Sequence, residues 1–175
     1  MIYHVRFKCA DDYNARRLPY RPAHLKQLDQ LSRQGLVVAG GPEPDGDYAN
    51  IFYDVPDRAA LDALLVDNEF NRAGLFVGSV PRVFTEFLAP IERPPLDTAF
   101  MVTIVEGKAA DRARASDGMS GLRRTGEVAF GGFFDGDAAL AVVRHADPHE
   151  AQRIVAKAGG WVFEGMSARP WSQTL

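Results

Sequence analysis

Residues 35–41, Gly-Leu-Val-Val-Ala-Gly-Gly, have a counterpart in residues 126–132, Gly-Glu-Val-Ala-Phe-Gly-Gly. Each stretch has the pattern of a helix that ends at its first glycine, followed by a short apolar strand and a Gly-Gly turn. The turn Asp45-Gly46-Asp47 recurs in the same order as Asp135-Gly136-Asp137. Ordered matches of this kind predict an internal duplication, and a repeat decides the fold of the whole chain.

The first copy predicts the order strand, helix, strand, strand, helix, strand, which is the split βαβ arrangement. Alternating apolar residues indicate strands, and leucines at helical spacing indicate helices. The predicted elements are a strand at 2–7, a helix introduced by residues 20–22 and ended by Gly35, strands at 36–39 and 49–54, a helix from 56 to 65, and strand character through 78–88.

A proline-rich segment separates the two copies. We expect a first α+β unit at residues 1–89, a stiff linker at 90–97 and a degenerate second unit at 98–175. The predicted fold class is α+β, with two tandem ferredoxin-like βαββαβ units. Helices cover one face of each sheet, so the other face needs a partner. Pairing of the units as an α+β barrel, within one chain or as a homodimer, satisfies that need.

Composition narrows the function classes. A formal net charge of −3 argues against nucleic acid as a partner, and no apolar run reaches the ~20 residues that span a membrane. The single Cys9 excludes an internal disulfide and fits a cytoplasmic protein. Neither Gly131-Gly132 nor Gly159-Gly160 has the spacing of a phosphate-binding loop, so we expect no cofactor. His145 and His149 lack a third ligand, so we expect no metal either.

Three segments carry a family resemblance: Arg21-Pro22-Ala23-His24-Leu25, Gly40-Gly41-Pro42-Glu43-Pro44 and residues 70–76, Phe-Asn-Arg-Ala-Gly-Leu-Phe. In them the first copy resembles the YCII family of small dimeric α+β barrel proteins, whose members are similar to muconolactone-isomerase-type barrels. The resemblance covers about half of the chain. It implies the fold more strongly than the reaction. One member type is a dehydrochlorinase of aromatic breakdown.

The resemblance places the family's histidine at His24, where it implies a general acid/base supported by a carboxylate. Helical spacing independently puts His24 on the core-facing side of its helix. The family's aspartate position holds Asn68, so either Asp67 has taken that role or the His-Asp pair is broken. Arg21 and Phe70 come from the same segments, and we expect both to contact the substrate.

His4 and Arg6 alternate with Tyr3, Val5 and Phe7, so they lie on the other face of the first strand. We expect them to bind an anionic or phenolic substrate. The leading hypothesis is a cofactor-independent small-molecule enzyme of the isomerase, lyase or dehydrohalogenase type, acting on an aromatic or polyketide-like substrate. The alternative is a non-catalytic binding or accessory protein with the same pocket.

Overall fold

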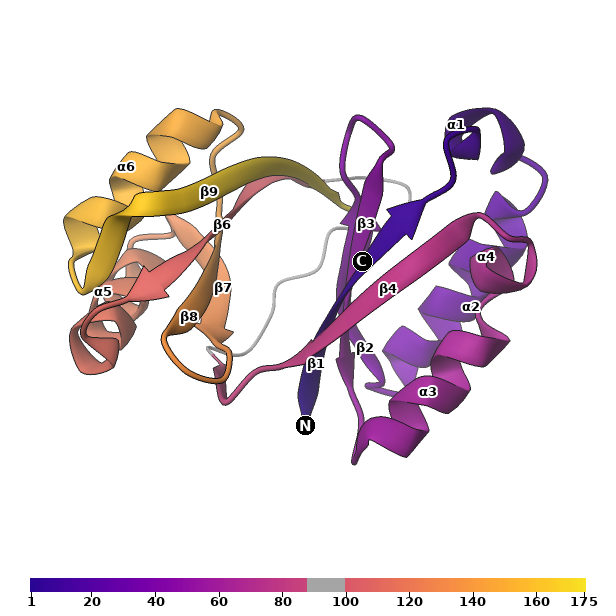
Figure 1. Cartoon of the computed structure of the whole chain (residues 1–175), viewed down its shortest axis with the longest axis horizontal. Helices are drawn as coiled ribbons and strands as arrows, with labels where there is room; N and C mark the ends of the chain where they lie inside the picture. Colours follow the sequence, from indigo (N-terminus) through magenta and orange to yellow (C-terminus); the bar gives the residue numbers. More distant parts are fainter. Residues whose placement is uncertain (88–99) are drawn as a thin grey trace. The chain divides into compact units, whose positions relative to one another are not determined.

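The computed structural model describes residues 1–87 and 100–175 (Figure 1). It divides the chain into unit 1, Met1–Val83 with Thr174–Leu175, and unit 2, Phe84–Gln173. The predicted linker at 90–97 lies outside the described residues. The two units repeat one order of elements, so the predicted tandem pair of ferredoxin-like α+β units is confirmed.

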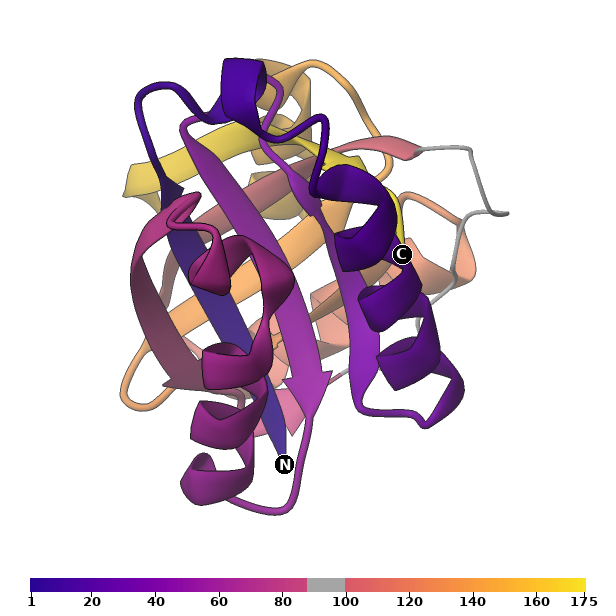
Figure 2. The ribbon, with the colours of Figure 1, turned by 90° about the vertical axis from the view of Figure 1, so that its right-hand side faces the viewer.

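Unit 1 is an antiparallel sheet with its helices on one face (Figure 2). The strand order is β2-β3-β1-β4. Its elements are β1 (Ile2–Cys9), α1 (Tyr13–Arg16), α2 (Arg21–Arg33), β2 (Val37–Pro42), β3 (Tyr48–Asp54), α3 (Arg58–Asp67), α4 (Glu69–Arg72) and β4 (Phe76–Val83).

Alternation along the strands separates the two faces of this sheet. Val5 and Phe7 are fully buried under the helices together with Ile51 and Leu61. His4 and Arg6 point to the other face, as expected for a period of two. Local signals fix the helix ends. Asp57 caps α3 by accepting a hydrogen bond from the Ala60 N–H.

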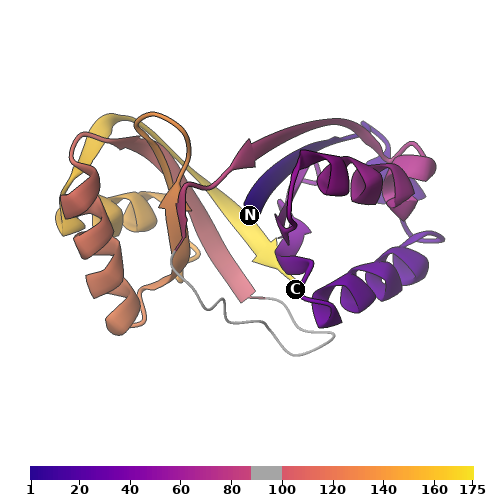
Figure 3. The same ribbon diagram turned by 90° about the horizontal axis from the view of Figure 1, so that it is seen from below.

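Unit 2 repeats this plan with five strands in the order β5-β7-β8-β6-β9. Helices α5 and α6 lie on the same side of its sheet (Figure 3). Asp111 and Asp147 cap the two helices, as Asp57 caps α3. The elements are β5 (Glu86–Phe87), β6 (Phe100–Ala109), α5 (Arg112–Arg124), β7 (Val128–Phe133), β8 (Ala138–Val143), α6 (Pro148–Ala158) and β9 (Trp161–Gln173).

The units begin and end at different residues from those expected. Strand character was predicted through 78–88, but β4 ends at Val83, and β5 pairs with β7 inside unit 2. Thr174 and Leu175 belong to unit 1, where the N–H groups of both residues donate to the Gly40 carbonyl. Unit 1 is therefore built from two separate stretches of sequence.

Strand register shows which positions of the two units correspond. His4 lies opposite Phe52 on one side and Arg82 on the other. In unit 2, Ile104 lies opposite Val142 and Arg169 in the same way. His4 therefore corresponds to Ile104.

Candidate functional site

His24 lies inside an aromatic cluster on the helical side of unit 1. It sits in the first turns of α2, and its side chain is buried, with a relative exposure of 6%. Its ring stacks on Phe70, with the ring centroids 3.7 Å apart and the planes 10° from parallel. Phe76 meets His24 edge-on at 6.1 Å, and Phe76 in turn stacks on Phe7 of β1 at 4.4 Å. His24 therefore lies between α2 and the helix-facing side of the sheet.

The charge state of His24 follows from this burial. Burial lowers the pKa of the imidazole to about 3, and the positive charge of Arg21 lowers it further. The Nδ1 atom is buried and has no hydrogen-bond partner in the described part of the chain. At neutral pH the ring is therefore neutral. Its Nδ1 atom can therefore form a hydrogen bond with a group that the described residues do not supply.

Asp67 does not support His24. Its side chain is 71% exposed and pairs with Arg72, with Oδ1 3.0 Å from Nη1. The Asp67 carbonyl accepts a hydrogen bond from Gln27 Nε2 at 2.7 Å. Asp67 ends α3 and points to solvent, so a one-residue shift does not bring its carboxylate to the imidazole.

Asn68 is buried, but its side chain caps a helix and does not contact His24. Its Oδ1 accepts hydrogen bonds from the N–H groups of Phe70 at 2.9 Å and Asn71 at 3.3 Å, so it caps α4. On the other side of the cap, Gln27 Oε1 accepts from the Glu69 N–H. Asn68 and Gln27 thus hold the helix that presents Phe70 to His24. Of the two alternatives in the sequence analysis, the structure therefore fits the broken His-Asp pair, because position 68 acts as a helix cap.

His4 and Arg6 lie on the opposite face of the sheet, in a buried polar network. His4 Nε2 is 2.9 Å from Asn50 Oδ1, and Asn50 Nδ2 donates to Glu43 Oε1 at 3.1 Å. Arg6 binds the same carboxylate with two nitrogens, at 3.0 and 3.1 Å. A carboxylate oxygen and an amide oxygen only accept here, so Nε2 of His4 carries the proton.

Arg82 completes this network from β4. Its Nη2 lies 3.2 Å from His4 Nδ1, which accepts because Nε2 carries the proton. Phe52 stacks on the His4 ring at 4.7 Å, and the Arg6 guanidinium lies 3.5 Å from the centroid of Tyr48. No local sequence pattern marks Glu43, Asn50 or Arg82 as partners of His4 and Arg6, because only the strand register brings them together.

The sheet separates the residues that the sequence analysis placed in one site. His24 and Phe70 lie on the helical face of unit 1, whereas His4 and Arg6 point away from it. Strand alternation requires this, since Val5 and Phe7 between them face the helices. Arg6 therefore does not hold an anionic group of a small substrate that sits at His24.

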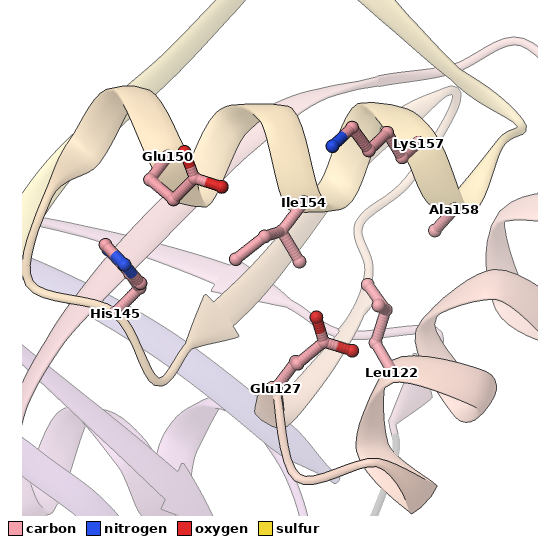
Figure 4. Close-up of a pocket in the computed structure, with 7 residues that line it drawn as sticks. All are labelled: Leu122, Glu127, His145, Glu150, Ile154, Lys157 and Ala158. Carbon is pink, nitrogen blue, oxygen red and sulfur yellow. The ribbon is translucent and has the colours of Figure 1, made fainter.

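Unit 2 carries a groove of about 380 Å³ between α5 and α6 (Figure 4). Glu127 occupies the place of Leu36, which packs against the unit 1 core. A carboxylate therefore lines the groove where unit 1 has a leucine. Two of its polar side chains have local partners: Thr125 donates to Glu127, and the Asp147 N–H donates to His145 Nδ1. The lining residues are Leu122, Glu127, His145, Glu150, Ile154, Lys157 and Ala158.

Three further findings concern the described residues, 1–87 and 100–175. No three side chains among their histidines, cysteines, aspartates and glutamates gather as a metal ion would require, and the His145–His149 segment is included. None of their helices is long and apolar enough to cross a membrane. Cys9 is buried, and burial raises the pKa of its thiol to about 12, so the thiolate is scarce.

The fold defines a class, two ferredoxin-like α+β units in one chain. Residues 1–80, which make up most of unit 1, match the family model of the YCII-related domain. No curated protein matches the sequence significantly.

Solved structures share the whole fold at low identity. A putative monooxygenase from Lactobacillus acidophilus aligns with a TM-score of 0.61 and 11% identity, over 99% of this chain and 94% of that one. One from Fusobacterium nucleatum aligns with a TM-score of 0.55 and 10% identity, over 99% and 92%. These two similarities describe the fold. A 5-chloro-2-hydroxyhydroquinone dehydrochlorinase from Burkholderia phenoliruptrix, solved with 2,5-dihydroxybenzoquinone, aligns over 49% of this chain and 95% of its own, with a TM-score of 0.43 and 19% identity.

Proposed function

We propose that unit 1 is a small-molecule enzyme that transfers a proton through His24 without a cofactor. The observation that carries this proposal is the buried, unpartnered Nδ1 of His24. An unpaired buried polar atom costs roughly 1–3 kcal/mol. Unit 2 fills the corresponding helix position with Ala115, which is fully buried. The fold thus accepts a methyl group at this position, which supports a role for the imidazole beyond its packing on Phe70.

The chemistry follows from the charge state. Neutral His24 accepts a proton from an acidic C–H or O–H group of the substrate, and the electron pair stays on the substrate as an enolate or phenolate. Burial and Arg21 disfavour the imidazolium, so it passes the proton on. Delivery to another carbon gives an isomerase. Where a leaving group departs with the electron pair, the same base gives a lyase or dehydrohalogenase, and His24 later releases its proton to solvent.

The low pKa of His24 also restricts the kind of substrate that the site can use. Protonating a group whose pKa is about 3 rather than 6.5 costs about 5 kcal/mol more. An anionic group beside Arg21 offsets this cost, because it neutralises a charge that opposes the imidazolium. We therefore propose an aromatic or polyketide-like substrate that carries, or develops, a negative charge.

Hydrogen–deuterium exchange tests the proposal whatever product the reaction forms. A panel of hydroxylated benzenes and 1,3-dicarbonyl compounds is incubated in D₂O with the protein, and exchange at carbon is followed by NMR. We expect His24→Ala, the residue found in unit 2, to lower exchange by about 10²- to 10⁴-fold. His149→Ala is the matched control, since His149 is exposed on α6. Equal exchange by wild type and His24→Ala would exclude His24 as the acid/base.

A second candidate is a binding protein without catalysis. It is favoured by the placement of Asp67 and Asn68, neither of which contacts the imidazole. In that case the same panel compounds bind to the wild-type protein and shift the NMR signals of His24. No compound then exchanges faster with the protein than without it.

A further inference from the structure

Two arginines of unit 1 differ from their neighbours in having no carboxylate partner. On the helical side, most arginines pair with an acid within about one turn. Arg17 and Arg21 form no such ion pair with any residue in the ranges 1–87 and 100–175. The paired arginines are Arg16 with Asp12, Arg33 with Asp29, Arg58 with Asp62, and Arg72 with Asp67 and Glu69.

Arg17 is the more unusual of the two, because its guanidinium is partly buried. Its Nε atom is buried and has no hydrogen-bond partner among the described residues. Its Cζ lies 5.2 Å from the centroid of the Tyr13 ring. A buried N–H group without an acceptor is costly, and one on a charged group is more costly than one on a neutral group. The position of Arg17 is therefore suited to a ligand that supplies an anionic acceptor.

Arg17 and His24 border the same aromatic cluster. Tyr13, which Arg17 contacts, meets Phe70 edge-on at 5.8 Å, and Phe70 stacks on His24 at 3.7 Å. The cluster thus has two unpartnered buried nitrogens at its border, Arg17 Nε and His24 Nδ1. Arg17 Nε–H is a hydrogen-bond donor on a cation, and His24 Nδ1 belongs to a neutral imidazole.

The segment between the two arginines exposes apolar surface. Leu18 is 67% exposed and Tyr20 37%, and they flank Pro19 between Arg17 and Arg21. Two unpaired cations on either side of exposed apolar side chains suit a ligand with both a negative charge and a flat apolar body. An inorganic anion would use only the arginines.

We propose that Arg17 is the anion-binding residue of the His24 site, and that the substrate is a planar aromatic or conjugated carboxylate or phenolate. Its charged oxygen accepts from Arg17 Nε–H, Arg21 adds a second positive charge, and Leu18 and Tyr20 contact its ring. This assignment rests on the proposed function of His24. Arg17 thus takes the anion-binding role that the sequence predicts for Arg6, which lies on the other face of the sheet.

Binding of simple probes tests the assignment. Salicylate is compared with its neutral analogue salicylamide and with inorganic phosphate, by titration of the full chain. Charge-assisted hydrogen bonds of this kind correspond to roughly ten- to hundredfold in affinity. We expect Arg17→Gln to weaken salicylate by that factor and to leave salicylamide unchanged. Arg33→Gln is the matched control, since it removes a paired, exposed arginine from α2.

NMR of the arginine Nε–H groups gives a readout that does not depend on activity. Salicylate is expected to shift the Arg17 Nε–H signal and to slow its exchange with water. Phosphate binding as tightly as salicylate would overturn the aromatic part of the proposal. An unshifted Arg17 signal, or equal losses in Arg17→Gln and Arg33→Gln, would overturn the assignment of Arg17.

The two proposals fail in different ways. If Arg17→Gln weakens salicylate but His24→Ala leaves deuterium exchange unchanged, the anion site stands and the catalytic function falls. If His24→Ala abolishes exchange while Arg17→Gln leaves salicylate affinity unchanged, His24 is catalytic and the anion is held elsewhere.

Discussion

The sheet faces turned away from the helices differ sharply between the two units. In unit 1 this face carries the network of His4, Arg6, Glu43 and Asn50. Strand register gives the corresponding residues of unit 2. Arg6 lies opposite Asn50, and Glu106 lies opposite Leu140. Glu43 and Phe134 both donate their N–H to the start of the next strand. The unit 2 residues are Ile104, Glu106, Phe134 and Leu140.

The difference shows that the fold does not require polar residues on this sheet face. The unit 2 residues Ile104, Phe134 and Leu140 are almost fully buried, so one backbone plan accepts an apolar set at these positions. A buried charged network is often no more stable than apolar residues of similar size, although breaking it is costly. The polar residues of unit 1 therefore add specificity or function at this face rather than basic stability.

The largest expected effect is the loss of the Glu43 carboxylate. Glu43→Gln leaves Arg6 without its counter-ion and disturbs Asn50, so we expect unit 1 to lose about 3 kcal/mol of unfolding free energy. Hydrogen exchange of the β1 and β3 amides measures this loss of unfolding free energy. Glu106→Gln is the counterpart in unit 2. Glu106 accepts from Arg169 at 2.9 Å, and we expect a loss of about 1 kcal/mol there.

Replacing all four polar residues together tests whether the two sheet faces are interchangeable. His4→Ile, Arg6→Glu, Glu43→Phe and Asn50→Leu together give unit 1 the residues of unit 2. We expect a change of unfolding free energy within about 2 kcal/mol of zero, smaller than that of Glu43→Gln alone. A combined loss equal to the sum of four single losses would show that the two faces are not interchangeable.

Acid is expected to destabilise unit 1 through His24, which unit 2 lacks. The folded-state pKa of about 3 lies below the ordinary 6.5, so protons favour the unfolded chain. The stability that neutral His24 contributes is complete above pH 6.5 and is lost as the pH falls toward 3. At pH 4 the loss is about 3 kcal/mol. His24→Ala removes this component, so its stability should fall less between pH 7 and pH 4. Parallel curves for the two proteins would contradict the burial of a neutral imidazole.

A further difference between the units lies in the two Gly-Gly turns. A Cβ at Gly131 would lie 2.8 Å from the Leu140 carbonyl oxygen, whereas one at Gly40 would meet nothing closer than 3.4 Å. Gly131→Ala should cost about 2 kcal/mol, and Gly40→Ala less than about 1 kcal/mol. Both tryptophans lie in unit 2, so their fluorescence follows the unfolding of Gly131→Ala. Equal losses in the two variants would show that the Leu140 carbonyl can move aside.

The sequence predicts much of the fold because repeated patterns carry it. Alternation in residues 2–7, the glycines at 35 and 126 and the capping aspartates are local signals, and the structure uses each of them. The four-residue helices α1 and α4 were missed because they are too short to show a period. The end of β4 was missed because the apolar pattern continues past Val83, and no local signal marks a change of partner strand.

The candidate site was predicted less well, because its geometry depends on contacts between distant residues. Helical spacing places His24 on the buried side of α2, which the structure also shows. No local pattern reveals that Asn68 caps α4, or that Gln27 binds the backbone on both sides of it. The unpaired state of Arg17 is visible only once every neighbouring acid has been placed.

Gly40 has a consequence for how the protein is made. Its backbone groups bond to Thr174 and Leu175, and Thr174 is 134 positions further along the chain. A ribosome adds about 5–20 residues per second, so a nascent unit 1 waits several seconds with this strand edge uncovered. During that interval β2 is open to pairing with another nascent chain. Slowed translation of residues 84–173 should therefore increase aggregation of this protein in the cell.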